Sequence, residues 1–177
     1  MFENIIKNVH NRHPLIHCIT NYVSINDCAN IVLACGGAPI MAEDINEVSQ
    51  ITSICQGLDI NIGMLNDNKL SSMLKAGATA NELGIPVILD PVGAGSSDYR
   101  IKAVQNLMSN VQFGVIRGNV SEIKAIAAKQ GIHNIAAGVY ETMQKNKSAM
   151  GVEAGIADKI TDDNIKEMAD FINKLSQ

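Results

Sequence analysis

The chain has 177 residues, of which 46% are hydrophobic and 18% charged, and its formal net charge is −4. This length suits one domain with a real core, and the composition lies far from that of disordered chains. The acidic balance, without a clustered Lys/Arg face or any Trp, argues against a nucleic-acid partner. We therefore expect a single domain over residues 1–177 that binds no nucleic acid.

The N-terminus has no long apolar segment behind a basic start, as a signal peptide would. No run in the sequence approaches the about 20 apolar residues that a membrane span requires. The four cysteines have neither C-x-x-C spacing nor a small secreted scaffold around them. We expect a cytoplasmic protein without membrane association, whose thiols are reduced and mostly buried.

Up to residue 130, short apolar runs typical of buried strands alternate with helix-like stretches. The expected strands are Leu15–Ile19, Pro39–Met41, Leu58–Ile62, Pro86–Asp90 and Phe113–Arg117. The expected helices are Val23–Cys35, one that begins at Asp44 with Glu47 completing a capping-box-like start, Leu70–Leu83, Ile101–Met108 and Ser121–Lys129. This alternation indicates βαβ crossovers, and hence an α/β fold with a mostly parallel sheet and helices on both faces.

The pattern weakens after Gln130. Gly131–Gly155 shows no firm period, so we expect a loop with one helix over Val139–Lys145. Thr161–Asn164 caps a further expected helix over Ile165–Leu175. Such a helix normally precedes another strand, so a sheet edge could lie uncovered.

Two of the expected strands end in polar residues. Val87–Asp90 runs into Pro91–Gly95, and Gly114–Arg117 runs into Gly118–Glu122. Ligands of open α/β sheets bind at the carboxyl ends of the strands, where both of these exits lie. One exit offers a carboxylate, and the other offers an arginine and an Asn-x-x-Glu, which suits a site for magnesium and phosphate. The pair predicts a kinase.

Five sequence blocks occur in an order that is more specific than any one block: His17–Val23, Pro39–Ala42, Asn61–Gly63, Ile88–Gly95 and Ile116–Glu122. They resemble the N-terminal blocks of the hydroxyethylthiazole kinase family, which belongs to the ribokinase-like superfamily. Gly151–Gly155 resembles a later block. The resemblance implies a three-layer ribokinase-like fold and ATP- and Mg²⁺-dependent phosphorylation of the hydroxyl of 4-methyl-5-(2-hydroxyethyl)thiazole in thiamine salvage. It also implies a homotrimer with the thiazole site between subunits.

The resemblance places Asn21 and Met41 in the thiazole pocket. A polarizable thioether suits a sulfur-containing aromatic ring, and an amide can orient a ring nitrogen or a hydroxyl. From the residues alone, Met41 fits a core position after a short strand. Asn21 fits a helix N-cap ahead of Val23 equally well.

The resemblance also implies that Arg117 and Asn119 contact ATP and that Asp90 and Glu122 act on magnesium, usually through water. A guanidinium can hold phosphate oxygens bidentately. Magnesium keeps several waters and takes only one or two carboxylates. From the residues alone, Arg117 could form a surface salt bridge, and Asn119 with Glu122 a helix cap and a first-turn acid.

Full-length members of the family continue into a Gly-Thr-Gly-Cys or Gly-Ala-Gly-Cys segment. Its backbone N–H groups would stabilise the transferring phosphoryl group, and its Cys stands where the catalytic base would be. No cysteine of this chain lies in a Gly-x-Gly-Cys context. We therefore expect a C-terminally truncated domain with no catalytic residue present and with activity absent or severely reduced. The alternative is a non-catalytic thiazole-binding or assembly module derived from that kinase.

Overall fold

The computed structural model describes residues 2–130. The chain divides into two compact units, Met1–Asn119 and Val120–Gln177. The described part of the second unit is helix α6 (Val120–Gln130). The expected helices over Val139–Lys145 and Ile165–Leu175 lie outside the described residues, and the single domain over residues 1–177 stays a prediction.

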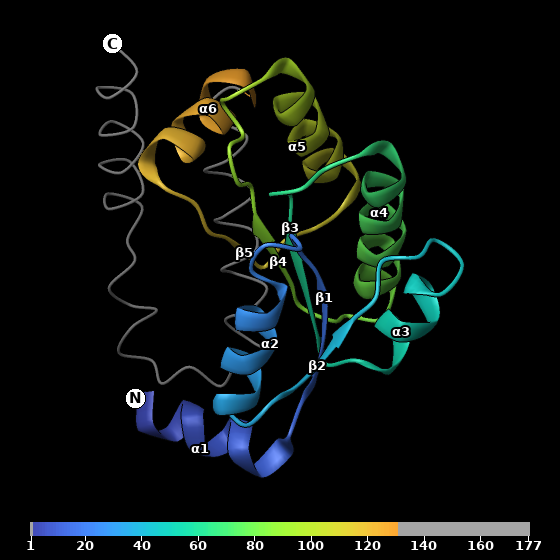
Figure 1. The fold of residues 1–177 in the computed structure, drawn as a ribbon, viewed down its shortest axis with the longest axis vertical. Helices are drawn as coiled ribbons and strands as arrows, with labels where there is room; N and C mark the ends of the chain where they lie inside the picture. Colours follow the sequence, from blue (N-terminus) through green and yellow to red (C-terminus); the bar gives the residue numbers. More distant parts are fainter. Residues whose placement is uncertain (1, 131–177) are drawn as a thin grey trace. The chain divides into compact units, whose positions relative to one another are not determined.

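The first unit alternates helices and strands, as Figure 1 shows. Its helices are α1 (Phe2–Arg12), α2 (Ile25–Ala34), α3 (Val48–Ile54), α4 (Asp67–Glu82) and α5 (Asp98–Asn110). Its strands are β1 (Leu15–Ile19), β2 (Ala38–Met41), β3 (Gly57–Asn61), β4 (Val87–Asp90) and β5 (Val115–Ile116). The strands form one parallel sheet in the order β2-β1-β3-β4-β5. The predicted α/β class is confirmed.

The two faces of the sheet differ in how they are covered, because successive strand residues point to opposite sides. One face, which we call the covered face, packs against α3, α4 and α5 (Figure 1). Its residues include Ile60, Val87 and Leu89, all buried. On the opposite, open face, α2 contacts β2, whereas Ile88 and Val115 are 41% and 53% exposed. The core of the unit therefore lies on the covered face.

Helix α4 approaches its neighbours closely because its buried face consists mainly of small residues. These buried positions include Met73, Ala76, Gly77 and Ala80. A Cβ added at Gly77 would lie 2.5 Å from a methyl group of Val111, so no side chain fits there without a shift. At the start of the helix the Asn66 side chain accepts a hydrogen bond from the Lys69 amide, which satisfies one of the free N–H groups of the first turn.

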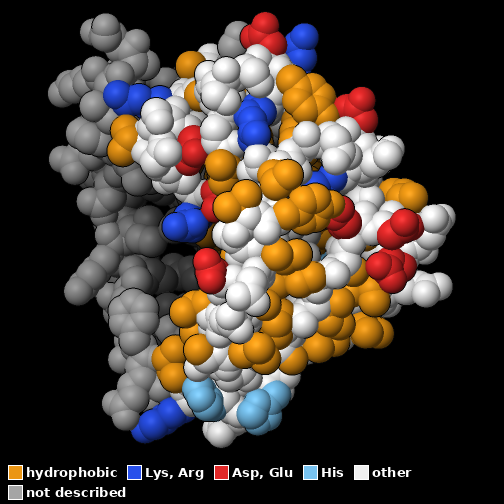
Figure 2. Space-filling model, viewed as in Figure 1, with side chains coloured by type: hydrophobic (Ala, Val, Ile, Leu, Met, Phe, Trp, Pro, Cys, Tyr) orange, Lys and Arg blue, Asp and Glu red, His pale blue; other side chains and the backbone are white. Residues whose placement is uncertain are grey.

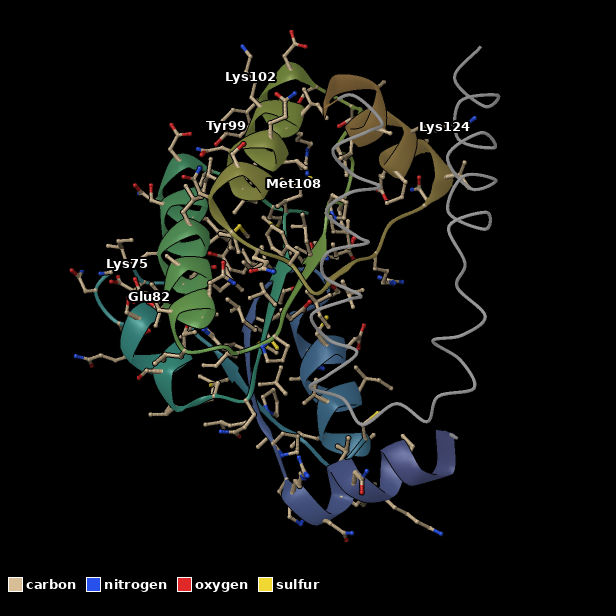
Figure 3. All side chains as sticks on the ribbon, turned by 180° about the vertical axis from the view of Figure 1, so that it is seen from behind. Lys75, Glu82, Tyr99, Lys102, Met108 and Lys124 are labelled. Carbon is tan, nitrogen blue, oxygen red and sulfur yellow. The ribbon has the colours of Figure 1, made fainter. Side chains whose placement is uncertain are left out.

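Helix α5 begins with the Ser97 side chain, which accepts from the amide of Arg100. The Tyr99 hydroxyl, labelled in Figure 3, donates to a carboxylate oxygen of Asp67 in α4 at 2.7 Å. The first turns of α4 and α5 are thereby joined.

No helix is predicted before Leu15, yet α1 spans Phe2–Arg12. The apolar residues at positions 2, 5, 6 and 9 have the three- and four-residue spacing of an amphipathic helix. That spacing is the signal from which this helix could have been predicted.

The capping box predicted from Asp44 is wrong. Helix α3 begins at Val48, and the Glu47 side chain makes no capping hydrogen bond. The Asp44 carboxylate instead accepts from the backbone amide and the side-chain amide of Asn46, at 2.8 and 2.9 Å. A short Asp side chain followed by a turn can satisfy its own local backbone, and here that local bond is formed in place of the helix cap.

The four cysteines differ in how deeply they are buried. Cys18 and Cys55 are buried, Cys28 is half-buried, Cys35 is exposed, and none of the four forms a disulfide. The thiols are therefore less buried than expected.

None of the described helices combines the length and the apolar character needed to cross a bilayer.

Candidate site at the carboxyl edge of the sheet

Three polar side chains from neighbouring strand ends form a connected network. Asn61 of β3 and Asp90 of β4 are register partners, and the Asn61 amide donates to Asp90 Oδ2 at 3.1 Å. Arg117 follows β5, and its Nη1 donates to the same oxygen at 2.9 Å. The parallel register thus brings Asp90 and Arg117 together, although they are separated by 27 residues in the chain.

The ion pair between Arg117 and Asp90 is weak and easily redirected. The Arg117 side chain is 79% exposed and that of Asp90 is 17% exposed. Ion pairs with one strongly exposed partner contribute about 0–1 kcal/mol. A bound anion could therefore draw the Arg117 guanidinium away at little cost, so the surface salt bridge and a ligand-binding role are compatible.

Asp59 adds a second carboxylate to the open face, one pleat along β3 from Asn61. Burial, and secondly the charge of Asp90, raise the pKa of Asp59 from 3.8 to about 6, while Arg117 acts to lower it. Sequence reasoning did not single out Asp59. The alternation of Asp59 and Asn61 with buried Leu58 and Ile60 is the signal that places both on the face of Asp90.

The thiol of Cys18 lies on the same face and is unreactive. Cys18 and Asp59 are register partners. Burial, and then the charge of Asp59, raise the pKa of Cys18 to about 12. His17 points to the covered face, where its ring bonds Thr52 and Ala42. The two residues are packed strand residues that point to opposite faces, and they form no thiol–imidazole pair.

Asn21 lies against the loop that follows β3. A Cβ added at Gly63 would lie 2.9 Å from Asn61 Oδ1 and 3.0 Å from Asn21 Nδ2. The Gly63 amide donates to Asn61 Oδ1 at 2.8 Å. Asn21 Oδ1 accepts from the amide of Ser24 at 3.0 Å, so it caps the turn that precedes α2 and not the helix itself. Because Gly63 has no side chain, Asn21 can approach the Asn61 network.

Met41 is half-buried at the end of β2. It is the register partner of Cys18, which in turn pairs with Asp59. Met41 therefore lies on the open face, two strand spacings, or about 10 Å, from Asp59 along one row of the sheet. It is not a fully buried core residue.

The remaining two predicted residues lie at the end of the first unit and in the second. Asn119 is exposed, two residues after Arg117. Glu122 lies in the first turn of α6, where the helix dipole favours a carboxylate. Within residues 2–130 no group of three or more His, Cys, Asp or Glu side chains is arranged to hold a metal ion. Mg²⁺ nevertheless binds proteins through only one or two carboxylates, and the partly exposed Asp90 carboxylate is an oxygen ligand of this kind.

Arg100 of α5 binds the two loops that follow Asn61 and Asp90 at the edge. Its Nη1 donates to the carbonyls of Ile62 and Val92 at 2.7 and 2.8 Å, and its Nη2 donates to the carbonyl of Gly63 at 2.8 Å. The planar guanidinium suits such a set of acceptors. Local sequence patterning gave no signal for this role.

The fold and the edge residues define the class of the protein: a parallel α/β sheet with an acid, an amide and an arginine at its carboxyl edge, which is where open α/β sheets bind their ligands. The chain belongs to the hydroxyethylthiazole kinase family, whose model matches residues 6–166.

Individual relatives agree with this assignment. The hydroxyethylthiazole kinase of Clostridium acetobutylicum is 50% identical over 177 residues, which are 100% of this chain and 59% of the relative. That of Methanobrevibacter smithii is 44% identical over 172 residues, 97% of this chain and 56% of the relative. The structure of the hydroxyethylthiazole kinase from Pyrococcus horikoshii OT3 matches with a TM-score of 0.70 and 36% identity, over 80% of this chain and 56% of that one. The chain thus spans less than two thirds of the length of these relatives.

Proposed function

We propose that the chain carries the thiazole side and the metal-and-phosphate side of a hydroxyethylthiazole kinase. The reaction would transfer a phosphoryl group from ATP to the hydroxyl of 4-methyl-5-(2-hydroxyethyl)thiazole, as in thiamine salvage. The observation that supports this most is the Asn61–Asp90–Arg117 network at the carboxyl edge, in a chain that belongs to this family.

Asn21 and Met41 are the proposed thiazole contacts. The half-buried Met41 side chain offers a polarizable surface to a sulfur-containing ring. The Asn21 side chain approaches Gly63 at the same edge of the sheet, where its amide can orient a ring nitrogen or the hydroxyl.

Arg117 and Asn119 are the proposed ATP contacts, supported by the exposure of both side chains beyond the end of β5. Asp90 and Glu122 are the proposed magnesium residues. When bound, Mg²⁺ would neutralise charge on the phosphate oxygens. Arg117 would then exchange its bond to Asp90 for bonds to phosphate oxygens, which a guanidinium holds bidentately.

A trimer and a location in the cytoplasm are the further parts of the proposal. Exposed apolar side chains near Asn21 and on α2 support self-association: Tyr22, Val23, Ile31 and Leu33. Figure 2 shows hydrophobic side chains gathered over the region where α2 lies in Figure 1. Light scattering coupled to size-exclusion chromatography would give the mass of three chains if the proposal is right.

Calorimetric titration of the chain with MgATP and, separately, with the thiazole alcohol tests the function. We expect both to bind, and Arg117→Ala to weaken MgATP binding about tenfold or more, since it removes a charge-assisted contact. Arg12→Ala, which removes an arginine of the last turn of α1, should leave both affinities unchanged. Turnover should be absent or severely reduced, because no Gly-x-Gly-Cys is present.

Two outcomes separate kinase from binding module. Phosphorylation of the thiazole alcohol that Arg117→Ala abolishes would exclude the non-catalytic module. Thiazole binding without affinity for MgATP would contradict the kinase proposal and favour the module.

A further inference from the structure

Lys69, in the first turn of α4, is a buried cation with three partners. Its side chain is 2% exposed. Its Nζ donates to the carbonyl of Thr20 at 2.6 Å, lies 2.8 Å from a carboxylate oxygen of Glu43 and stands 4.2 Å from the centre of the Tyr22 ring. An ammonium has three N–H donors, and the ring face is an electrostatic partner for the third. We call Lys69, Thr20, Tyr22 and Glu43 the Lys69 cluster.

The Lys69 cluster joins the two chain segments in which the proposed thiazole contacts lie. Thr20 and Tyr22 are the immediate neighbours of Asn21, and Glu43 follows Met41 by two residues. The Tyr22 hydroxyl also donates to Glu43. One residue of α4 thus contacts both strand exits, after β1 and after β2.

Stability alone does not account for this arrangement. A cation in the first turn of a helix opposes the helix dipole. Removing an ammonium from water costs several kcal/mol, and buried ion pairs are often replaced by apolar residues without loss of stability. Although burial acts to raise it, the hydrogen bonds from Lys69 and Tyr22 lower the pKa of Glu43, which favours the charged form of this carboxylate. The cost of burial falls on Lys69, because the Glu43 side chain is 38% exposed whereas that of Lys69 is 2% exposed, and the contacts of Lys69 join two separate chain segments.

The hydroxyl of Thr20 is a second indication that the segment bound by Lys69 does more than stabilise the fold. It is buried and has no hydrogen-bond partner in the described part of the chain. Such buried hydroxyl groups are rare in native proteins, because an unsatisfied group costs about 1–3 kcal/mol. The segment that Lys69 holds therefore presents a polar group that the fold itself does not satisfy.

We propose that Lys69 is a positioning residue for the thiazole alcohol: by binding the Thr20 carbonyl and the Glu43 carboxylate it sets the separation of Asn21 and Met41. This inference rests on the proposed function. A misplacement of about 1 Å can cost about 100-fold in reaction rate in a well-organised site, and binding contacts depend on position in the same way. Loss of Lys69 should consequently affect the thiazole and not the nucleotide.

The test is Lys69→Met, which keeps the length and apolar stem of the side chain. Lys75→Met is the matched control: Lys75, labelled in Figure 3, lies on the same helix and donates to the carbonyl of Ile45 at 2.8 Å, but no contact joins it to Thr20 or Tyr22 in the described residues. Titration of Lys69→Met should show thiazole affinity reduced about tenfold or more, with MgATP affinity unchanged. Lys75→Met should match the unaltered chain for both ligands.

Equal thiazole affinities for Lys69→Met and the unaltered chain would overturn the inference, as would equal losses for thiazole and MgATP. If Lys69→Met does not fold, Glu43→Gln decides. It weakens one anchor of the same cluster and should lower thiazole affinity selectively, and an unchanged affinity would overturn the inference. If the unaltered chain binds no thiazole alcohol, the proposed function itself fails.

Discussion

The two faces of the sheet carry different tasks. On the covered face, the residues of β3 and β4 pack against α4, which in turn packs against α3 and α5, and they are buried. On the open face, the same strands present Asp59, Asn61, Ile88 and Asp90, of which none is buried. The difference teaches that the residues of one face stabilise the fold, whereas those of the other face form the proposed site. Both sets are alternate residues of the same strands.

We expect the largest difference between the two faces at Leu89 and Ile88, because they are neighbours in β4 that point to opposite faces. Leu89 is fully buried, whereas Ile88 is 41% exposed. Leu89→Ala should lower the free energy of unfolding by about 2–5 kcal/mol, through lost burial and a cavity. Ile88→Ala should lower it by less than about 1.5 kcal/mol. Urea denaturation measures both, and equal losses would contradict the division.

Asp59 tests whether a polar residue of the open face lowers the free energy of unfolding. Its pKa is raised from 3.8 to about 6, so the folded chain binds a proton that the unfolded chain has already released between these values. Stability therefore falls as pH rises through this window, and the full cost applies above about pH 6. Asp59→Asn should stabilise the chain by about 1–3 kcal/mol near neutral pH. The gain should shrink below about pH 4.

The matched control for Asp59→Asn is Asp27→Asn, in the exposed first turn of α2. It should change the unfolding free energy by no more than about 1 kcal/mol, and in the destabilising direction, because it removes a charge that the helix dipole favours. A destabilised Asp59→Asn protein at neutral pH would mean that the Asp59 carboxylate supports the fold.

His17 tests the covered face with the opposite sign. Its Nε2 donates to the carbonyl of Ala42 and its Nδ1 accepts from the hydroxyl of Thr52, both at 2.8 Å, since a carbonyl can only accept. Burial lowers the pKa of His17 from 6.5, although the bond to Ala42 acts to raise it. The unfolded chain thus binds the proton first, and stability falls as pH drops below 6.5.

His17→Gln should remove this acid sensitivity, which can reach at most about 1.4 kcal/mol per pH unit. His10→Gln, at an exposed position of α1, should retain it. Unfolding free energies between about pH 7 and pH 5 measure the slope. An unchanged slope in His17→Gln would show that another group is responsible.

Strand positions could be predicted from the sequence because short apolar runs bounded by turn residues have few other structures. β1 was predicted to the residue, and β5 proved shorter than the predicted Phe113–Arg117. The site residues near strand ends, Asp90 and Arg117, could also be placed at one edge, because parallel strands share their carboxyl ends. The capping box predicted at Asp44 was wrong because a short carboxylate accepts hydrogen bonds from a local turn as readily as from the first turn of a helix.

The two basic residues that hold the loops could not be predicted. Lys69 and Arg100 lie on helices and reach strand exits 49 and up to 38 residues away in the sequence. Long side chains of this kind act through tertiary contacts, which leave no periodic signal in the sequence.

The most direct test of the account is a map of backbone amide NMR shifts on addition of each ligand. We expect the thiazole alcohol to shift the signals of Asn21, Met41 and Gly63, and MgATP to shift those of Asp90 and Arg117. Signals of the covered face should stay in place. Shifts confined to the helices of the covered face, or no shift at the carboxyl edge with either ligand, would contradict it.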